Sequence, residues 1–474
     1  MNRKHIVSAL LILLLAGDLI FSFFQYYNTP LYGDVDSHVL PDKHIQKVFE
    51  DPFGFNAIKT GEKHANPNRF FAHYFYAEYM QKIPIYLQKI TGSISSVYLS
   101  CALAKIIVQV IFIFLLASFI SGESNIFKRK FLLSAILIAP LFQAYGYWSR
   151  MGINDKSIAY TFFYSVPLVF LMIFLKPFLN QLFRNISFRS INYLLLLPLV
   201  IILPLSGPLI PAIIGIILLL MVIYYWIQSK NHITNRINSF FNRIPLQFYL
   251  LLLPIGIISI YSLFLGFYNS QNQAEIVSLA GRYALLPKGI YSHVFHAFGF
   301  PLMLSMIGIN SYLIKKVNTQ EGKKLLRVLI WIGIYSLIYI LLLPFGGYKI
   351  YRSLIIRYDT IMPVTTALIY FFGASSYFLL NNLKGKNKTK YSVAITICLL
   401  IYTVADIKGI GSNKCEREAL EKMANSTESI VPVPKDCYIM NWENIYDYKR
   451  SDRRAELIHH WKITPEKKLF FNEK

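Results

Sequence analysis

Two carboxylates two residues apart, Asp34 and Asp36, follow directly on the first membrane-length apolar run of the chain. Pro30 and Gly33 disfavour a helix here, so we expect an extended or irregular backbone on which the two side chains face the same way. Converging carboxylates repel each other, which raises the pKa of the pair unless a cation or a metal ion compensates them. One can then act as general base on a hydroxyl while the other orients it or holds a divalent ion.

The same stretch, 33–38, has a simpler interpretation as a solvated turn in which Ser37 and Asp36 cap the backbone. Its position beside the membrane surface favours the catalytic interpretation. His38 closes the stretch and is a further candidate for the site.

A second candidate site lies in the stretch 346–359, which carries the three cations Lys349, Arg352 and Arg357, with Tyr351 among them. Arginine presents a planar fork of donors to phosphate oxygens, lysine a point charge, and paired glycines let backbone N–H groups approach closely. The stretch therefore predicts a phosphate site. The alternative is that its Arg and Tyr residues only anchor the loop at the membrane interface.

The loop 268–296 adds Arg282 and His296 to the candidate phosphate ligands. His293 and His296 are three residues apart and share one face of a helix, where they can bind phosphate, shuttle a proton or hold a metal. Two histidines supply too few ligands for a zinc site, so interfacial histidines with satisfied hydrogen bonds are the simpler interpretation.

The composition determines what must position these residues. A chain of 474 residues that is 55% hydrophobic and 16% aromatic, with mean hydropathy +0.43, is a multi-pass membrane protein and not a soluble domain. Runs of about 17–25 apolar residues span the hydrocarbon layer as helices. Eleven such runs predict an all-α integral membrane bundle, near 5–24, 95–121, 131–147, 158–176, 191–205, 208–227, 246–267, 297–314, 325–344, 360–380 and 391–405.

The orientation follows from the basic loops, because Lys and Arg near span ends are retained on the cytoplasmic side. Every second connection is basic, starting with Arg3 and Lys4 and continuing to Lys384. We therefore expect a cytoplasmic amino terminus and an external carboxy terminus, in the plasma (inner) membrane. Much of the net charge of +23 is then topological, and no nucleic-acid partner is expected. The three cations of 346–359 lie outside, against this rule, so an anionic partner should compensate them.

The external segments are about 25–94, 147–157, 268–296, 345–359 and 406–474. In the first, Pro41 can begin one short amphipathic helix and Pro67 precedes another, and such helices commonly lie in the membrane interface. The polar segment 147–157 holds Trp148, Arg150 and Asp155.

The chain is expected to divide into a transmembrane part, 1–405, and a small external cap, 406–474, with a core of Trp442, Tyr446, Leu457 and Trp461. Cys415 and Cys437 both lie in this tail, where an oxidising compartment would allow a disulfide, although two free thiols remain the alternative.

Inside the bilayer, charged side chains are costly and usually paired or functional. Asp18 and Lys105 fall at similar depths of the first and second spans, so we expect a structural ion pair between them.

A first span, an acidic triplet, a long external loop with interfacial helices and many further spans resemble the membrane glycosyltransferases of the GT-C superfold. The likeness is closest to the mannosyltransferases that elaborate lipid anchors, in the local pattern YGDVDSH at 32–38. The resemblance implies an inverting sugar transfer from a polyprenyl-phosphate donor, with Asp34 or Asp36 as the base. Many such enzymes carry adjacent acidic residues, so the choice between the two stays open. Related oligosaccharide transferases hold a metal ion with a second external acid, which here would be Asp155, binding Mg or Mn.

The leading hypothesis is thus a glycosyltransferase whose partners are a polyprenyl-phosphate-linked sugar, a glycan, lipid or protein acceptor and membrane lipids. One alternative is an external polysaccharide polymerase or ligase, which acts on pyrophosphate-linked glycans and needs no acidic pair. Another is a lipid or solute transporter that makes no bond. Transporters often show repeats and polar residues near the midplane, and little of either is present here.

Overall fold

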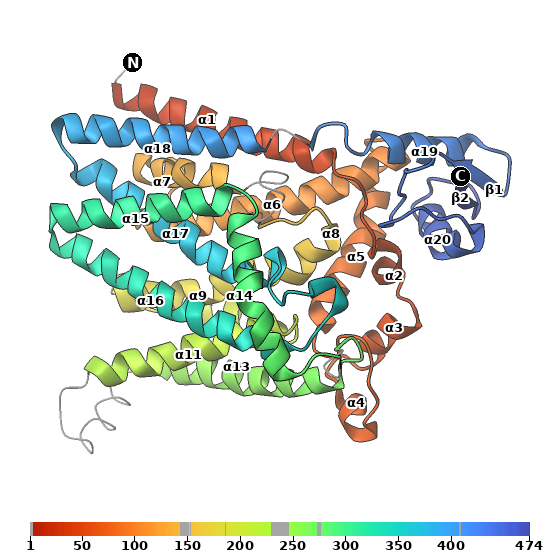
Figure 1. Cartoon of the computed structure of the whole chain (residues 1–474), viewed down its shortest axis with the longest axis horizontal. Coiled ribbons are helices and arrows are strands. Elements are labelled where there is room, and N and C mark those ends of the chain that lie inside the picture. Colours follow the sequence, from red (N-terminus) through yellow and green to blue (C-terminus); the bar gives the residue numbers. More distant parts are fainter. Residues whose placement is uncertain are drawn as a thin grey trace.

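Long helices lie side by side and form most of the molecule (Figure 1). The computed structural model describes residues 3–142, 151, 153–184, 186–228, 246–272, 276–406 and 409–474. The helices of this bundle are α1 (Arg3–Tyr27), α6 (Ser93–Ser121), α7 (Arg129–Ile138), α9 (Val166–Arg184), α10 (Ser190–Ile202), α11 (Leu209–Gln228), α13 (Leu246–Leu265), α15 (Gly299–Val317), α16 (Gln320–Leu342), α17 (Tyr358–Asn382) and α18 (Gly385–Ala405).

The described residues include seven helices long and apolar enough to cross a membrane, beginning at His5, Ser93, Ile158, Tyr249, Gln320, Tyr358 and Gly385. An eighth candidate is the pair α14 (Leu279–Phe295) and α15, which bend by 85° at the break between them. The architecture is that of an all-α multi-pass membrane protein, which confirms the predicted class. The count of eleven spans stays a prediction, because α7 and α10 are short apolar helices.

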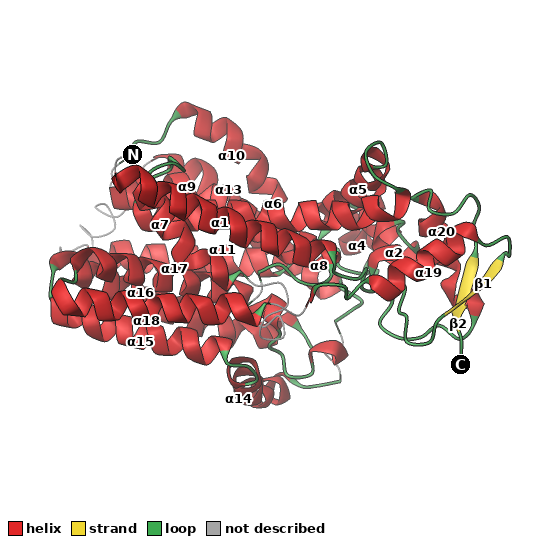
Figure 2. Cartoon of the chain, turned by 90° about the horizontal axis from the view of Figure 1, so that it is seen from above, coloured by secondary structure: helices red, strands yellow, loops and turns green. Residues whose placement is uncertain are grey.

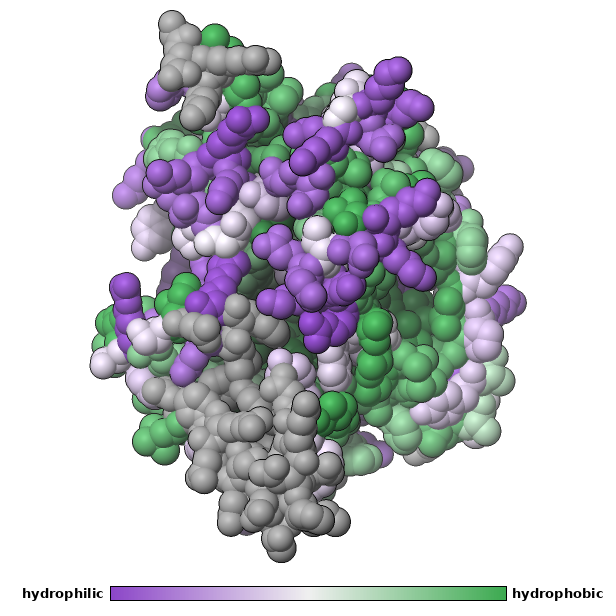
Figure 3. Space-filling model, turned by 90° about the vertical axis from the view of Figure 1, so that its left-hand side faces the viewer, coloured by the Kyte–Doolittle hydropathy of each residue, from purple (hydrophilic) through white to green (hydrophobic). Residues whose placement is uncertain are grey.

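The two ends of the bundle differ in chemistry. The amino terminus and the turns from α15 to α16 and from α17 to α18 share one end, and the short helices and the carboxy-terminal segment lie at the other (Figure 1). The turns at the first end carry exposed lysines, among them Lys315 and Lys386. Hydrophilic side chains gather on this end (Figure 3). The predicted alternation of basic connections is consistent with this placement.

Four short helices follow α1: α2 (Val35–Val39), α3 (Lys43–Glu50), α4 (Phe55–Thr60) and α5 (Phe70–Leu87). The helices expected after Pro41 and Pro67 correspond to α3 and α5. The start of α3 is capped by Asp42, whose carboxylate accepts from the backbone N–H groups of His44 and Ile45, both at 2.8 Å.

The helix α2 overturns the expected extended backbone at the acidic triplet. Asp34 is its N-cap residue and Asp36 lies in its first turn. Pro30 precedes the helix by several residues and removes none of its hydrogen bonds, so it offers no obstacle. Residues two apart on a helix do not face each other, so the argument that Asp34 and Asp36 point the same way fails with the strand.

The carboxy-terminal segment contains α19 (Lys414–Asn425), α20 (Asp452–His460) and the parallel strands β1 (Ile430–Val433) and β2 (Leu469–Asn472) (Figure 2). Leu457 and Trp461 are fully buried, as expected for its core. Trp442 and Tyr446 are not part of this core, since 53% and 52% of their surfaces are exposed. Two of the four residues expected in this core are therefore confirmed, and the other two are wrong.

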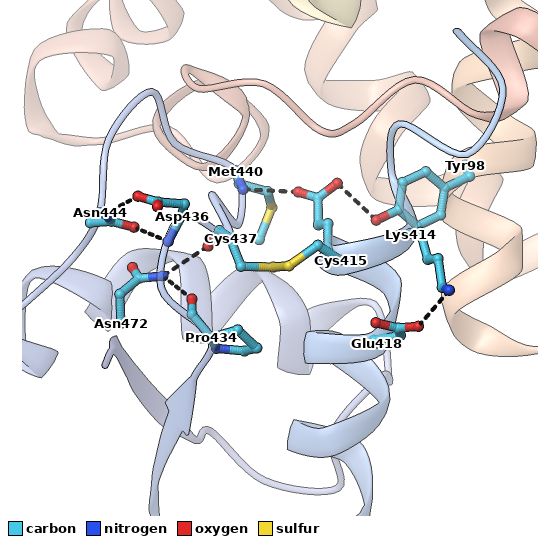
Figure 4. Close-up of a disulfide and its surroundings, with 11 residues drawn as sticks. Tyr98, Lys414, Cys415, Glu418, Pro434, Asp436, Cys437, Met440, Asn444 and Asn472 are labelled. Atoms are coloured by element: carbon cyan, nitrogen blue, oxygen red, sulfur yellow. Dashed lines mark hydrogen bonds and ion pairs between the residues drawn. A yellow bond between two sulfur atoms is a disulfide. The ribbon is translucent and has the colours of Figure 1, made fainter. Parts of the chain in front are cut away.

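A disulfide joins Cys415 and Cys437, as the tail's two cysteines suggested (Figure 4). The adjacent Glu416 is buried and ties three parts of the chain together. Its carboxylate accepts from the N–H of Leu31 at 2.8 Å, the hydroxyl of Tyr98 at 2.8 Å and the N–H of Met440 at 3.0 Å. The segment thereby holds the start of the first long loop against α6.

The ion pair expected between Asp18 and Lys105 is absent. The buried amine of Lys105 donates instead to the carbonyl of Lys156 at 2.6 Å and lies over the ring of Tyr26. Span depth can be counted along a sequence, but the direction in which a side chain leaves its helix depends on packing, and α6 directs Lys105 toward the 153–157 loop.

Candidate functional site

Asp34 begins α2 with a left-handed backbone. Its φ is 72°, in a region that aspartate adopts more readily than most residues other than glycine. Its carbonyl oxygen lies 2.8 Å from Nδ1 of His38. Its half-buried carboxylate receives no hydrogen bond and no ion pair from the described residues. No described side chain would therefore have to be displaced for a hydroxyl to reach this carboxylate.

Asp36 differs from Asp34 in having a partner. It is 6% exposed, and one carboxylate oxygen lies 3.7 Å from the guanidinium of Arg454 in α20. The two acids of the triplet are therefore not an equivalent pair, and Asp36 links α2 to the carboxy-terminal segment.

A stack of rings lies beside α2. His38 and His73 are parallel, with ring centroids 5.1 Å apart, and Phe163 contacts both, at 5.3 and 4.8 Å. His73 is fully buried, and neither of its ring nitrogens has a hydrogen-bond partner among the described residues. Burial lowers the pKa of both histidines, which favours neutral rings at pH 7.

The cations predicted to bind phosphate gather around one buried carboxylate, that of Asp359. Arg352 lies 3.2 Å from it, and Nε of Arg357 donates to it at 3.0 Å. Between the two arginines, Ile355 has φ 68°, an outlier for a β-branched residue. Strain of this size persists only where surrounding contacts hold it, and it is common at functional sites.

Arg69 joins this group from the start of α5, far away in sequence. Its guanidinium lies over the rings of Phe163 at 5.1 Å and Tyr164 at 5.5 Å, and the Tyr164 hydroxyl accepts from Arg352. Arg69 is 7% exposed, and its Nε has no partner among the described residues. A buried guanidinium donor without an acceptor is costly, and a ligand oxygen is a natural partner for it.

Positive charge exceeds negative charge here. The group contains Arg69, Lys349, Arg352 and Arg357, whereas the carboxylates described near it are that of Asp359 and, beside it, that of Asp155. Burial, and then the neighbouring charges of Arg352 and Arg69, lower the pKa of Lys349 to about 6. An amine in this state gains a proton when an anion arrives.

A π-helical turn, η3 (Thr161–Ser165), lies between the two halves of the candidate site. The acidic half is α2 with Asp34 and Asp36, and the cationic half is the group of cations around Asp359. Phe163 contacts His38, His73 and Arg69, while Tyr164 and the preceding Tyr160 face the arginines, with Arg357 4.8 Å above the Tyr160 ring. Single π turns within α-helices are frequent at functional sites. A narrow pocket adjoins the turn, lined by Arg69, Phe163, Tyr164, Leu168, Ser206, Gly207, Pro208, Leu209, Ile210, Ile213, Asp359, Met362 and Pro363.

The remaining predicted site residues lie around this centre. The ring of Tyr351 packs against two of the cations, with its centroid 5.4 Å from the guanidinium of Arg352 and 5.1 Å from that of Arg357. Arg282 is committed elsewhere, since it donates to the carbonyl of Pro344 at 2.5 Å. His296 is exposed at the bend between α14 and α15.

The metal role predicted for Asp155 has poor support from its surroundings. Asp155 accepts from the N–H of Ser157 at 2.7 Å. Its charged neighbours include the amines of Lys105 and Lys156 and the carboxylate of Asp359, which the arginines already hold. Burial raises the pKa of Asp155 to about 6. This donor set does not fit a divalent cation. Trp148 and Arg150 lie outside the described residues.

Sequence reasoning missed Arg69, His73 and the π turn. Arg69 is one arginine before an aromatic helix and His73 one histidine within it, so neither has a motif to reveal it. The sequence offers one signal for the charge cluster itself: Asp359 follows Arg357 by two residues, and this spacing suggests an ion pair between them.

No protein-family model, curated protein or solved structure matches the chain. The chemistry of the site therefore has to be inferred from the positions of its own residues.

Proposed function

We propose that the chain is an inverting glycosyltransferase that moves a sugar from a polyprenyl-phosphate donor to a glycan, lipid or protein acceptor at the outer membrane face. One observation carries the proposal. A carboxylate with no partner among the described residues and a group of three arginines and a lysine lie beside the aromatic segment that runs from Tyr160 through the π turn, at one end of a bundle of membrane-length helices. A base for a hydroxyl and a site for a departing phosphate are the two parts that such a transfer needs.

In this mechanism Asp34 accepts the proton of the acceptor hydroxyl as its oxygen attacks the anomeric carbon. The bond from that carbon to the phosphate oxygen breaks, and the departing phosphate takes the electron pair. Attack opposite the leaving group inverts the anomeric centre. Arg69, Arg352 and Arg357 stabilise the negative charge that grows on the phosphate, in a site with little water to compete.

Asp34 is the better candidate for the base because Asp36 is paired. The Arg454 guanidinium lies 3.7 Å from the Asp36 carboxylate, where a hydroxyl would have to approach. Asp34 has no such competitor among the described residues, and a base must reach its proton within hydrogen-bond distance.

The orientation that suits this proposal puts the site outside and the basic turns in the cytoplasm. The lysine-bearing turns and the amino terminus share the end opposite the site (Figure 1). If basic loops are retained on the cytoplasmic side, the site faces the outside of the proposed plasma membrane.

The test is transfer of labelled sugar from a polyprenyl-phosphate donor by purified protein in proteoliposomes. Asp34→Asn should reduce the rate by about 10²–10⁴-fold, the usual contribution of a general base. Glu50→Gln, an exposed acid of the same loop, is the matched control and should keep full activity.

The same assay separates the alternatives. Full turnover in Asp34→Asn removes the acid-base role, and if Arg352→Gln is then inactive, a polymerase or ligase acting on pyrophosphate-linked glycans is favoured. Labelled lipid that crosses the membrane with no acceptor and no bond formed would indicate a transporter.

A further inference from the structure

An exposed tryptophan stands beside the acidic triplet. Trp442 is 53% exposed, whereas Trp461 of the same segment is fully buried. The Trp442 indole stacks on Tyr32, with centroids 5.2 Å apart and planes within 17°. A Cβ on Gly33 would lie 2.2 Å from the indole nitrogen, so the indole sits where glycine alone leaves room. The next residue is Asp34.

The loop that carries Trp442 is braced. Met440 has φ 48°, and its N–H donates to Glu416 at 3.0 Å. Arg454 donates to the carbonyl of Met440 at 3.0 Å and to the side chain of Asn441 at 3.1 Å, and the same guanidinium faces Asp36. A strained backbone held by buried charges presents the indole in one position. A fixed aromatic ring is what a binding site needs, because little conformational freedom is lost on binding.

The surroundings of this indole are polar. Asn444 donates to Asp436 at 2.9 Å and to the hydroxyl of Tyr446 at 3.2 Å, and Glu443 pairs with Arg450 at 2.9 Å. The exposed side chains of 434–451 include tyrosines, acids and bases but no leucine, isoleucine, valine or phenylalanine.

The other exposed aromatic group of this end is different. Phe53, Phe55 and Phe267 are 41%, 65% and 77% exposed, and Phe267 lies at the end of a membrane-length helix. Exposed phenyl rings near a membrane-length helix suit lipid, whereas an indole in a segment of exposed tyrosines, acids and bases suits a ligand with one apolar face and many hydroxyls.

We propose that the exposed face of Trp442, backed by Tyr32, is the acceptor subsite and binds a sugar ring of a glycan acceptor. The proposal rests on the glycosyltransferase function and narrows its acceptor class to carbohydrate. The C–H face of a sugar ring packs on the indole, and the neighbouring amides and charged groups bind its hydroxyls. Arg454 is then a positioning residue, since it holds Asn441 and Met440 on one side and α2 on the other.

The first experiment measures kinetics in the transfer assay. Trp442→Ala should raise the acceptor KM roughly tenfold, with the donor KM unchanged, and Trp442→Tyr should restore most of the loss. Phe55→Ala, an equally exposed aromatic elsewhere, should leave both constants unchanged. An unchanged acceptor KM in Trp442→Ala would overturn the proposal.

The second experiment does not depend on catalysis. Purified full-length protein is applied to an array of immobilised oligosaccharides. Asp34→Asn should bind like the wild type and Trp442→Ala should not, so retained binding with no transfer refutes the proposed reaction but keeps the subsite. The subsite is refuted if the wild type binds no oligosaccharide, or if vesicles of brominated phosphatidylcholine quench the fluorescence that Trp442→Phe removes, because the indole then lies in lipid.

Discussion

The two halves of the candidate site are held in opposite ways. The cationic half is nearly self-contained: Arg352, Arg357 and Asp359 lie within eight residues of one another and pair directly. The acidic half is a five-residue helix, α2, whose neighbours come from distant segments. Arg454 lies close to Asp36, and Arg453 donates to the carbonyl of Leu40, just after α2. Glu416 accepts from the N–H of Leu31, in the segment before α2.

This difference suggests a division of labour. The ion pairs of Arg352 and Arg357 with buried Asp359 would keep the proposed phosphate-binding group in shape whether or not a ligand is bound. A short helix has no such internal stability, so the position of its base depends on the carboxy-terminal segment. Damage to the cationic half should therefore affect folding and donor binding, and damage to the link between α2 and the carboxy-terminal segment should affect turnover.

The largest effect is expected from Asp359→Asn. It leaves Arg352 and Arg357 without their buried carboxylate, and breaking a buried ion pair from one side costs about 3–5 kcal/mol. The free energy of unfolding in detergent should fall accordingly. Asp452→Asn breaks an exposed pair with Lys467 and serves as control, with a loss of about 1 kcal/mol or less. Equal losses in the two variants would show that Asp359 holds no charge cluster.

Arg352→Gln should act on the donor. Removing one donor to a developing oxyanion typically costs about 10²–10³ in rate, and the acceptor KM should not change. Arg69→Gln should give the same pattern, because both guanidiniums adjoin Tyr164. Arg129→Gln, at the exposed start of α7, is the control and should leave both KM values and the rate unchanged. A change confined to the acceptor KM would show that the arginines bind the acceptor and not the donor.

A smaller effect is expected at the Asp36–Arg454 pair. Asp36→Asn and Arg454→Gln should each lower turnover, and the double variant should be no worse than the poorer single one. Contacting residues of this kind couple by about 0.5–3 kcal/mol. Donor KM should stay unchanged in all three. Fully additive losses would mean that the two side chains act separately and that α2 is held by something else.

Some of this could be read from the sequence and some could not. The apolar runs, the basic turns, the acidic triplet and the cationic loop 346–359 are local patterns, and each lies within a short window. The role of Arg69 depends on a contact with Tyr164, which is 95 residues away, and the pairing of Asp36 with Arg454 spans 418 residues. The extended backbone at Asp34 was wrong because a helix can begin just after glycine and proline as readily as stop before them.

The smallest effect is a pH dependence at Lys349, whose pKa is lowered to about 6 by burial and by the charges of Arg352 and Arg69. Between pH 6 and 10.5 the amine is neutral when folded and protonated when unfolded, so this residue makes stability rise with pH across that range. A bound phosphate opposes the arginine charges and raises the pKa, so binding at pH 8 should take up a fraction of a proton. Calorimetry with undecaprenyl phosphate in buffers of different ionisation enthalpy measures that uptake, and affinity should weaken as pH rises above 8. Lys349→Met should abolish the uptake. Uptake that persists in the variant would place the proton on another group and leave Lys349 outside the phosphate site.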